Sequence, residues 1–440
     1  MKKIGALLLI FLGLAAFVYF YEIEGQKTRE EAKKLEESLL RSEQEDIIGL
    51  ELSRFNQPDL VLIREGEEWT IRKPIEAVAS KASVEGLLRS LEGAQRDRIF
   101  TAEKDEVKVY GLEKPRMTLK IDSGEQERTL LVGGEDYTGN KIYVQLAGTD
   151  QVFLTSNAIY SSADKDLEEW RSKKILFFES NKTQAIEIDG PKGQIRLMRQ
   201  KDWFLEEPIS ERADQNTVSN LLSALQYGEV QNFISDQPKG LRKYGLDRPR
   251  VKIRLRHEGE DRWSELQVGK EIDGNYHARN SDRVSVFTVQ EDLRKKLIQD
   301  VWNFRDKDVI NVSQEEIDRL VMHREGGKIV LRREDYKWII EEPEAQKDQE
   351  AIGYKFWYPM DDIKYKSIQE SSEISQSIAE ADVEVVITRK DGEKRTFAFM
   401  QGDNGYIAIQ QDSGRKGTIS SESFEKLQFK IEDIVSTSDG

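Results

Sequence analysis

The stretch Glu68-Trp69-Thr70-Ile71-Arg72-Lys73-Pro74 occurs in three related copies in the 440-residue chain. The second copy runs from Asp202 through Trp203 to Pro208, and the third from Lys337 through Trp338 to Pro343. The three tryptophans are 134 and then 135 residues apart. A period of that length is typical of a domain with its own core, not of a short solenoid repeat. The chain is therefore predicted to contain three related units in tandem.

Three further patterns recur at a similar spacing. The turn Tyr110-Gly111-Leu112-Glu113-Lys114-Pro115-Arg116 returns 134 residues later, from Tyr244 to Arg250. An apolar stripe that is typical of one amphipathic helix occurs twice, at Val84, Leu87, Leu88 and Leu91 and at Val218, Leu221, Leu222 and Leu225. The ends of the units share Arg171 with Lys173 and Arg305 with Lys307, at a hinge into the next unit. The predicted boundaries are 47–182, 183–314 and 315–440.

The third unit is predicted to be a degenerate copy. It keeps the Trp338 strand but lacks the Tyr-Gly-Leu turn, and Pro359 is expected to interrupt its helix near Phe356 and Trp357. An altered last unit is typical of the cap of a repeat array.

Within each unit the strand signals follow one another with short polar turns between them, as from Ile195 to Leu205 and from Met117 to Leu154. This order predicts an α+β fold, in which each unit is an antiparallel meander sheet with one or two packed helices.

The first 21 residues are predicted to be a transmembrane anchor. Eighteen uncharged residues from Ile4 to Tyr21 are enough to span a bilayer as a helix, and they end in an aromatic cluster. A cleaved signal peptide is the alternative, but its apolar core would be shorter. Lys2 and Lys3 favour an N-terminus inside the inner (cytoplasmic) membrane, with the bulk of the chain extracytoplasmic. Residues 22–46 are predicted to form a charged helical spacer.

The composition excludes several classes of function. A net charge of −15 argues against an unaided nucleic-acid binder, and the absence of cysteine excludes thiol catalysis, disulfides and thiolate metal sites. The three histidines, His257, His277 and His323, lack a chelating spacing. The chain also has no phosphate loop, nucleophile elbow or dinucleotide fingerprint. We therefore predict no catalytic, cofactor-binding or metal-binding residue, no nucleic-acid partner and no small-molecule ligand.

Two motifs have both a structural and a functional interpretation. Trp69, Trp203 and Trp338 could be stacking platforms for a flat ligand, but apolar residues two positions further on favour burial over the core. The turns at Tyr110, Gly111 and Pro115 and at Tyr244, Gly245 and Pro249 could present Arg116 and Arg250 to an anion. A left-handed glycine followed by a rigid proline is instead typical of a turn that begins a strand.

The one concentrated basic stretch is a candidate contact site. Arg250, Lys252, Arg254 and Arg256 alternate with Val251, Ile253 and Leu255, so the last three of the basic residues share one strand face. This face could bind a lipid phosphate or an acidic envelope polymer, or it could simply be solvated opposite acidic neighbours.

Taken with the Leu131-Val132-Gly133 and Gln267-Val268-Gly269 strand ends, these motifs resemble the bacterial membrane-anchored domain-of-unknown-function family numbered four-three-four-zero. The resemblance implies repeated units behind an N-terminal anchor, and genes beside those of ABC transporters of the gliding-motility type. It brings no catalytic residues. We therefore expect a non-enzymatic auxiliary subunit of such a transporter, in contact with its permease or associated subunits. An envelope module that binds an anionic polymer, glycan or lipid headgroup is the alternative.

Overall fold

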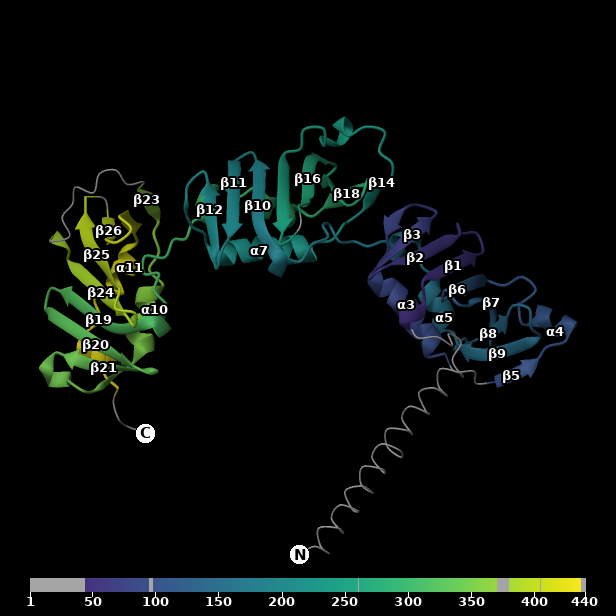
Figure 1. The fold of residues 1–440 in the computed structure, drawn as a ribbon, viewed down its shortest axis with the longest axis horizontal. Coiled ribbons are helices and arrows are strands. Elements are labelled where there is room, and N and C mark those ends of the chain that lie inside the picture. The colour runs from purple at the N-terminus through teal and green to yellow at the C-terminus, as the bar shows by residue number, and fades with distance from the viewer. Residues whose placement is uncertain (1–43, 95–97, 260, 370–379, 404, 437–440) are drawn as a thin grey trace, which may run out of the picture. The chain divides into compact units, whose positions relative to one another are not determined.

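The computed structural model describes residues 44–94, 98–259, 261–369, 380–403 and 405–436 and contains three nine-stranded antiparallel sheets (Figure 1). The first sheet lies within residues 47–182, the second within 183–314 and the third within 315–440. The predicted anchor, and the predicted spacer as far as residue 43, lie outside the described residues. In the described ranges, no helix combines the length and the apolar character needed to cross a membrane.

The strands follow one another in the same way in the three repeats. The first repeat contains β1 (Gly49–Arg54), β2 (Leu60–Glu65), β3 (Glu68–Lys73), β4 (Ala77–Val78), β5 (Arg98–Thr101), β6 (Met117–Asp122), β7 (Glu127–Glu135), β8 (Lys141–Leu146) and β9 (Gln151–Ser156). The second contains β10 (Thr183–Gly190), β11 (Gly193–Arg199), β12 (Trp203–Glu207), β13 (Glu211–Arg212), β14 (Phe233–Ser235), β15 (Val251–His257), β16 (Trp263–Ile272), β17 (Asn275–Asn280) and β18 (Val286–Val289). The third contains β19 (Ile317–Arg324), β20 (Gly327–Glu334), β21 (Lys337–Glu342), β22 (Glu350–Ala351), β23 (Ser367–Gln369), β24 (Val383–Arg389), β25 (Lys394–Gly402), β26 (Gly405–Gln410) and β27 (Arg415–Ile419).

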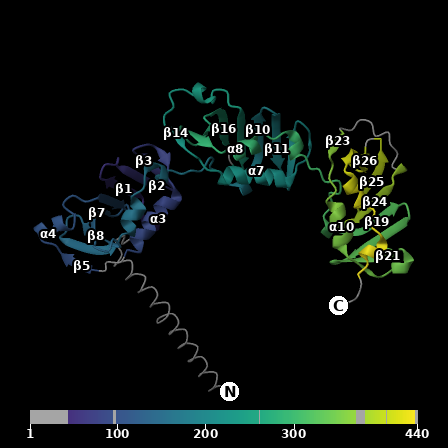
Figure 2. The same ribbon diagram turned by 180° about the vertical axis from the view of Figure 1, so that it is seen from behind.

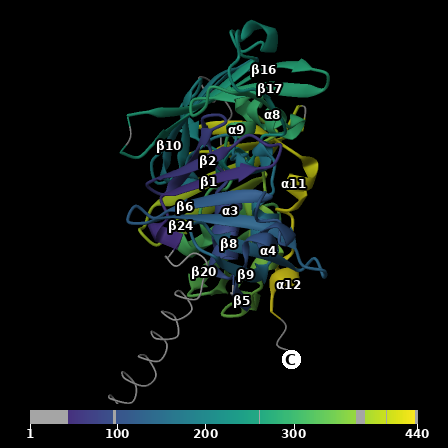
Figure 3. The same ribbon diagram turned by 90° about the vertical axis from the view of Figure 1, so that its right-hand side faces the viewer.

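Each sheet consists of two meanders that meet at its centre. The order in the first sheet is β4-β3-β2-β1-β6-β7-β8-β9-β5, and the other two sheets repeat it strand for strand. The two halves are joined by the pair β1 and β6, with Leu50 opposite Ile121 (Figure 3). Strand β5 pairs with β9 at the far edge, which the predicted simple meander did not include. The third repeat has the full strand order, although its sequence is the most divergent.

The helices are more numerous than the one or two per unit that we predicted. The described residues hold α3 (Lys81–Glu92), α4 (Lys104–Val109), α5 (Ala158–Ala163), α6 (Leu167–Trp170), α7 (Gln215–Tyr227), α8 (Glu291–Leu297), α9 (Val301–Phe304), α10 (Gly353–Asp361), α11 (Ser421–Glu425) and α12 (Ile431–Ile434). Most have four to seven residues, too few for a recognisable apolar period. The predicted interruption at Pro359 was wrong, because α10 continues through this residue. Phe356, Trp357 and Met360 of α10 are buried in the core, which offsets the lost backbone hydrogen bond.

The main core of the first repeat lies between one face of the sheet and its helices. Leu50 and Leu52 alternate with polar residues along β1, so both point to the same face. The α3 residues Val84, Leu87, Leu88 and Leu91 are buried in the same cluster. Figure 2 shows α3 and α7 each lying along one face of a sheet. At about 1.5–3 kcal/mol for each buried aliphatic side chain, this face supplies most of the stability of a repeat.

Packing divides the chain into two compact units. One comprises the residues up to Arg196 together with Ser219–Gln299, and the other comprises Leu197–Val218 together with Asp300–Gly440. The segment that connects the first repeat to the second lies inside the unit that contains Ser219–Gln299. The segment that connects the second repeat to the third lies inside the unit that contains Asp300–Gly440.

Candidate functional site in the joints between repeats

The chain leaves the first repeat through a segment, residues 171–175, that hydrogen-bonds to both repeats. Arg171 forms a β-bridge with Ala79 of its own repeat. Two residues later, Val230 N–H donates to the Lys173 carbonyl at 2.7 Å, and Lys174 forms a bridge with Glu229 of the second repeat. We call this segment and its partners the first joint.

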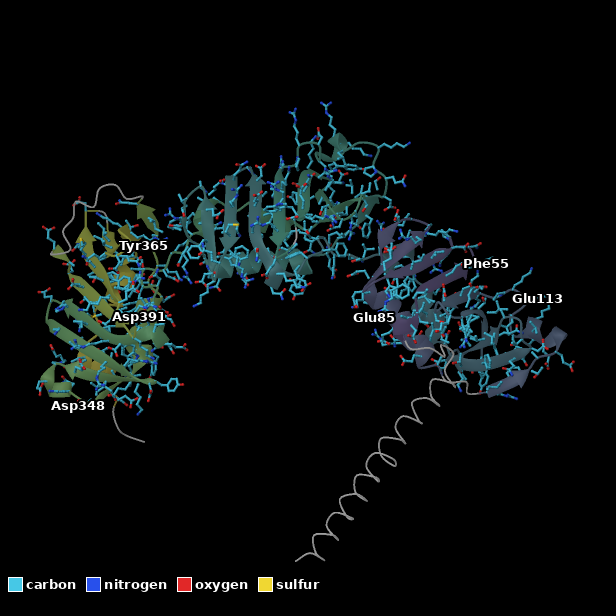
Figure 4. The ribbon with its side chains drawn as sticks, in the orientation of Figure 1. Phe55, Glu85, Glu113, Asp348, Tyr365 and Asp391 are labelled. Carbon is cyan, nitrogen blue, oxygen red and sulfur yellow. The ribbon has the colours of Figure 1, made fainter. Side chains whose placement is uncertain are left out.

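The second joint, formed by residues 305–309 and their partners, repeats this arrangement. Arg305 forms a bridge with Ala213, and Asp308 forms a bridge with Lys364 of the third repeat. Tyr365, which is labelled in Figure 4, donates its N–H to the Lys307 carbonyl at 2.8 Å. The two joints therefore use the same backbone contacts at matching positions.

An arginine near the hairpin that joins the last two strands of the meander closes each joint, Arg283 in the β17–β18 turn and Arg415 at the start of β27. In the first, Arg283 of the β17–β18 turn donates from Nη1 to the Ser172 carbonyl at 3.1 Å and from Nη2 to the Lys174 carbonyl at 2.8 Å. In the second, Arg415 donates to the carbonyl of Asp306, which holds the same place as Ser172. The joints thus share two arginines, Arg171 with Arg283 and Arg305 with Arg415.

The two joints differ in the carboxylates that meet these arginines. Glu211 accepts from Arg305 Nε at 2.6 Å and from Arg305 Nη2 at 3.1 Å, and it also lies 3.4 Å from Arg415 Nη2. The equivalent residue of the first repeat is Ala77: Ala77 pairs with Ile71 as Glu211 pairs with Leu205. The first joint therefore lacks the carboxylate that bridges the two arginines of the second.

In the first joint, Arg171 has a different acidic partner. Its Nη2 lies 2.6 Å from Asp236 Oδ1, and its guanidinium stacks on the Phe233 ring at 3.5 Å. Its Nε, the atom equivalent to the Arg305 Nε that meets Glu211, has no hydrogen-bond partner in the described part of the chain. Arg171 is 5 % exposed, so this polar atom is buried without a partner.

Burial lowers the pKa of both arginines of the first joint. Burial, and then the nearby Arg171, lower the pKa of Arg283 to about 10. Burial likewise lowers the pKa of Arg171, although Asp236 opposes that shift. Both guanidinium groups remain protonated at neutral pH, and a second negative charge between them would be favourable.

A groove of about 620 Å³ opens over this pair within the first compact unit. One wall is formed by the turn after β3 with Pro74, Ile75 and Ala77, and the other by the β17–β18 turn with Val284 and Ser285. Its charged lining residues are three arginines and three carboxylates, Arg72, Arg171 and Arg283 with Glu76, Asp236 and Asp282. The Ser285 hydroxyl is buried and has no hydrogen-bond partner among the described residues. The groove therefore combines apolar walls with unsatisfied polar groups, as small-ligand sites do.

The three motif tryptophans lie elsewhere, in the main cores. Trp69, Trp203 and Trp338 are 5, 7 and 1 % exposed, so none presents a face to a flat ligand. In each repeat the proline that ends this strand follows a cis peptide bond, at Pro74, Pro208 and Pro343.

The Tyr-Gly-Leu turns cover the opposite face of the sheet. Gly111 and Gly245 adopt φ values of 69° and 70°, which explains the glycine at both positions. The Tyr110 carbonyl accepts from Gly134 N–H at 2.8 Å, at a bulge in β7, and a side chain at Gly133 would overlap that carbonyl. The turn and the Leu-Val-Gly strand end are thus two halves of one contact.

The tyrosines, the prolines and Arg116 of this motif also have structural roles. Tyr110 packs on Tyr143 with ring centroids 4.5 Å apart, and Tyr244 stacks on His277 at 5.2 Å. Pro115 and Pro249 lie two residues before β6 and β15. Arg116 forms an ion pair with Glu135 at 2.6 Å.

The predicted basic strand face lies on β15 opposite acidic residues. Arg254 forms an ion pair with Glu187 of β10 and lies directly opposite Glu265 of β16. In the same register, Lys252 lies opposite Asp189. Arg254 and Arg256 also lie over the Trp263 ring, at 5.4 and 5.7 Å. These cations therefore share their strand face with acids.

Arg250 lies apart from that face. It is exposed at the start of β15, where it lines a separate recess with Arg248 and Lys270. From the sequence we predicted Arg171 and Arg305 only as hinge residues, and we did not predict a role for Arg283, Arg415 or Glu211. A position-by-position comparison of the repeats would have shown that Ala77 is replaced by Glu211, but not that Glu211 contacts Arg305 and Arg415.

Over the described ranges, no cluster of His, Asp and Glu could hold a metal ion.

Comparison with known proteins places the chain in a family. No curated protein matches it. Two segments, residues 69–204 and 203–398, match the family described as "Domain of unknown function (DUF4340)". Both begin at a tryptophan strand, so the family unit starts inside one sheet and continues through a joint into the next. The two matches span more than half of the chain, and the protein therefore belongs to this family of unknown function.

Proposed function

We propose that this protein is a non-enzymatic, membrane-anchored extracytoplasmic auxiliary subunit of an ABC-type transporter complex of the gliding-motility kind, acting through protein–protein contacts. The apolar N-terminal segment supports the anchor, and the family resemblance supports the transporter. The recurring joints support a scaffolding role, because each repeat exit is hydrogen-bonded to the next repeat. Any ATP would be used by the partner.

An exposed tyrosine pair on α10 is the observation that carries the contact role. Tyr354 and Tyr358 are 63 and 60 % exposed and lie one helical turn apart, on the same face. The opposite face of α10 is fixed in the core by Phe356 and Trp357. Tyrosine is enriched in protein interfaces, because it offers a large contact area at little entropic cost. A rigid helix that presents two tyrosines therefore suits a partner protein.

Photo-crosslinking in native membranes tests this proposal. A photoreactive phenylalanine analogue is placed at Tyr354 or at Tyr358 of the full chain, and the adducts are identified by mass spectrometry. We expect one adduct to a permease or an associated transporter subunit from both positions. Tyr336, at the tip of the β20–β21 hairpin and 92 % exposed, serves as the matched control.

The outcomes separate the proposal from its alternatives. Adducts only to a second copy of the chain, or no adduct at either position, would contradict the transporter role. Equal capture of the same subunit from Tyr336 would contradict a specific role for α10.

A further inference from the structure

The second joint contains a carboxylate that the first joint lacks. Glu211 bridges Arg305 and Arg415 through its two carboxylate oxygens. In the first joint Arg171 holds the place of Arg305, and Arg283 donates to the carbonyl of Ser172, which is equivalent to the Asp306 carbonyl that Arg415 meets. The position of Glu211, however, is Ala77. Ala77 lines the groove of about 620 Å³, next to Arg171 and Arg283.

Two residues that line the groove have a buried polar atom without a hydrogen-bond partner among the described residues. Arg171 Nε is buried without a partner, whereas the same atom of Arg305 donates to Glu211 at 2.6 Å. The Ser285 hydroxyl is a second buried group without a partner, and it lines the same groove. Arg283 donates to backbone carbonyls and, among the described residues, forms no ion pair that would neutralise it. Asp236 forms an ion pair with Arg171, and Asp282, which also lines the groove, forms its ion pair with Arg262.

We propose that the first joint is a binding site for a small anionic ligand, whose carboxylate or phosphate group takes between Arg171 and Arg283 the place that the Glu211 side chain takes between Arg305 and Arg415. An arginine fork suits the paired oxygens of either group. The groove volume is that of a site for a small molecule rather than for a single ion. Pro74, Ile75 and Val284 pack against the uncharged part of the ligand.

This site is independent of the α10 contact and of the basic strand face. The tyrosine pair belongs to the third repeat, whereas the groove lies within the first compact unit. Loss of ligand binding would therefore leave the crosslinking result unchanged, and the reverse also holds.

Isothermal titration calorimetry on the full chain in detergent micelles tests the proposal. The probes are sodium glucuronate, inorganic phosphate and, as the uncharged control, glucose. We expect saturable binding of glucuronate, of phosphate or of both, weakened by added salt, and no binding of glucose. Binding of glucuronate alone assigns a carboxylate ligand, and binding of phosphate alone assigns a phosphate ester. Saturation by neither probe would overturn the site.

Two substitutions of Ala77 test whether the missing carboxylate creates the binding site in the first joint. A77E supplies the missing carboxylate from within the chain, so the affinity for the anion should fall at least about tenfold while the thermal midpoint rises. A77Q adds nearly the same volume without the charge and should raise the midpoint less. Equal affinities of A77E and the unmodified chain would overturn the proposal, and circular dichroism verifies that each variant is folded.

The reciprocal change creates the site in the second joint. E211A leaves Arg305 and Arg415 without their shared carboxylate, so the anion that binds the first joint should now raise the thermal midpoint of E211A more than that of the unmodified chain. E344A removes an exposed glutamate from the third repeat and serves as the control. If E211A and E344A respond equally to the anion, the arginine pair is not the binding element.

Discussion

Arg305 and Glu211 form a two-point ion pair across 94 residues of sequence, with Nε–Oε1 at 2.6 Å and Nη2–Oε2 at 3.1 Å. Both side chains are largely buried, at 11 and 19 % exposure. The same carboxylate also lies 3.4 Å from Arg415 Nη2. A single acidic side chain therefore contacts both of the cations that close the second joint.

Replacing Glu211 by alanine should destabilise the protein. Removing one partner of a buried pair leaves an uncompensated charge, and here both Arg305 and Arg415 lose the carboxylate that they share. We expect E211A to lower the free energy of unfolding by about 2–4 kcal/mol, measured by urea unfolding and circular dichroism. E344A, which removes an exposed glutamate paired with Lys347, should change it by less than about 0.5 kcal/mol. Similar losses for both variants would contradict a special role for the joint.

The motif tryptophans should behave as core residues. Trp338 is 1 % exposed, and we expect W338A to cost about 3–5 kcal/mol of unfolding free energy. Trp263 is only half-buried on the outer face of β16, and W263A should cost less than half as much. Urea unfolding of the two variants provides the comparison. A larger loss in W263A would show that the outer face contributes more stability than the core.

Two glycine-to-alanine substitutions should have opposite effects. A side chain at Gly269 would overlap the Tyr244 carbonyl, so G269A should destabilise by about 1–3 kcal/mol. Gly86 lies in α3 with open space around it, so G86A should stabilise by about 0.5–1 kcal/mol through helix propensity. Thermal unfolding of both variants measures whether each substitution raises or lowers the stability. A stabilising G269A would contradict the close contact between turn and strand.

Asp136 should make the stability of the first repeat dependent on pH. Burial raises the pKa of Asp136, but hydrogen bonds from the Thr138 hydroxyl at 2.8 Å and from Lys141 N–H at 3.2 Å outweigh it. The pKa therefore lies below its usual value of 3.8 in the folded state. The ionised form stabilises the fold above pH 3.8, and this contribution is lost as the pH falls through the folded pKa.

The variant D136N tests whether the charge of Asp136 stabilises the fold at neutral pH. Its unfolding free energy should be below that of the unmodified chain at pH 7, and the difference should shrink as the pH is lowered through the acid range. T138V removes one of the hydrogen-bond donors and should show the same trend. A difference that is constant with pH would mean that the Asp136 charge is not involved.

Much of the repeat architecture could be predicted from local patterns. The spacing of Trp69, Trp203 and Trp338 identifies the copies, and alternation along β1 and β6 identifies the strands and their buried face. Short elements were missed, because β4 has two residues and α6 has four, and neither carries a period. Pro359 was misjudged because the burial of its neighbours outweighs the lost hydrogen bond.

The candidate site depended on contacts between residues far apart in the sequence. Glu211 meets Arg305 across 94 residues and Arg415 across 204, and no local pattern connects them. The cations of β15 were predicted as a contact site because they alternate within one strand, yet they lie among acids of the neighbouring strands. Pairing across strands is decided by register, which the charge pattern of one strand does not reveal.

Three copies of one sheet-forming unit in tandem could be recognised in the amino-acid sequence, because hydrophobic periodicity and turn residues act over a few positions. The folded chain was needed to show that the exit of one repeat is hydrogen-bonded to the next, and that two arginines beside Ala77 have no counterpart of the Glu211 carboxylate. The reason is physical: charge compensation is a property of atoms a few ångströms apart, whatever their separation along the chain.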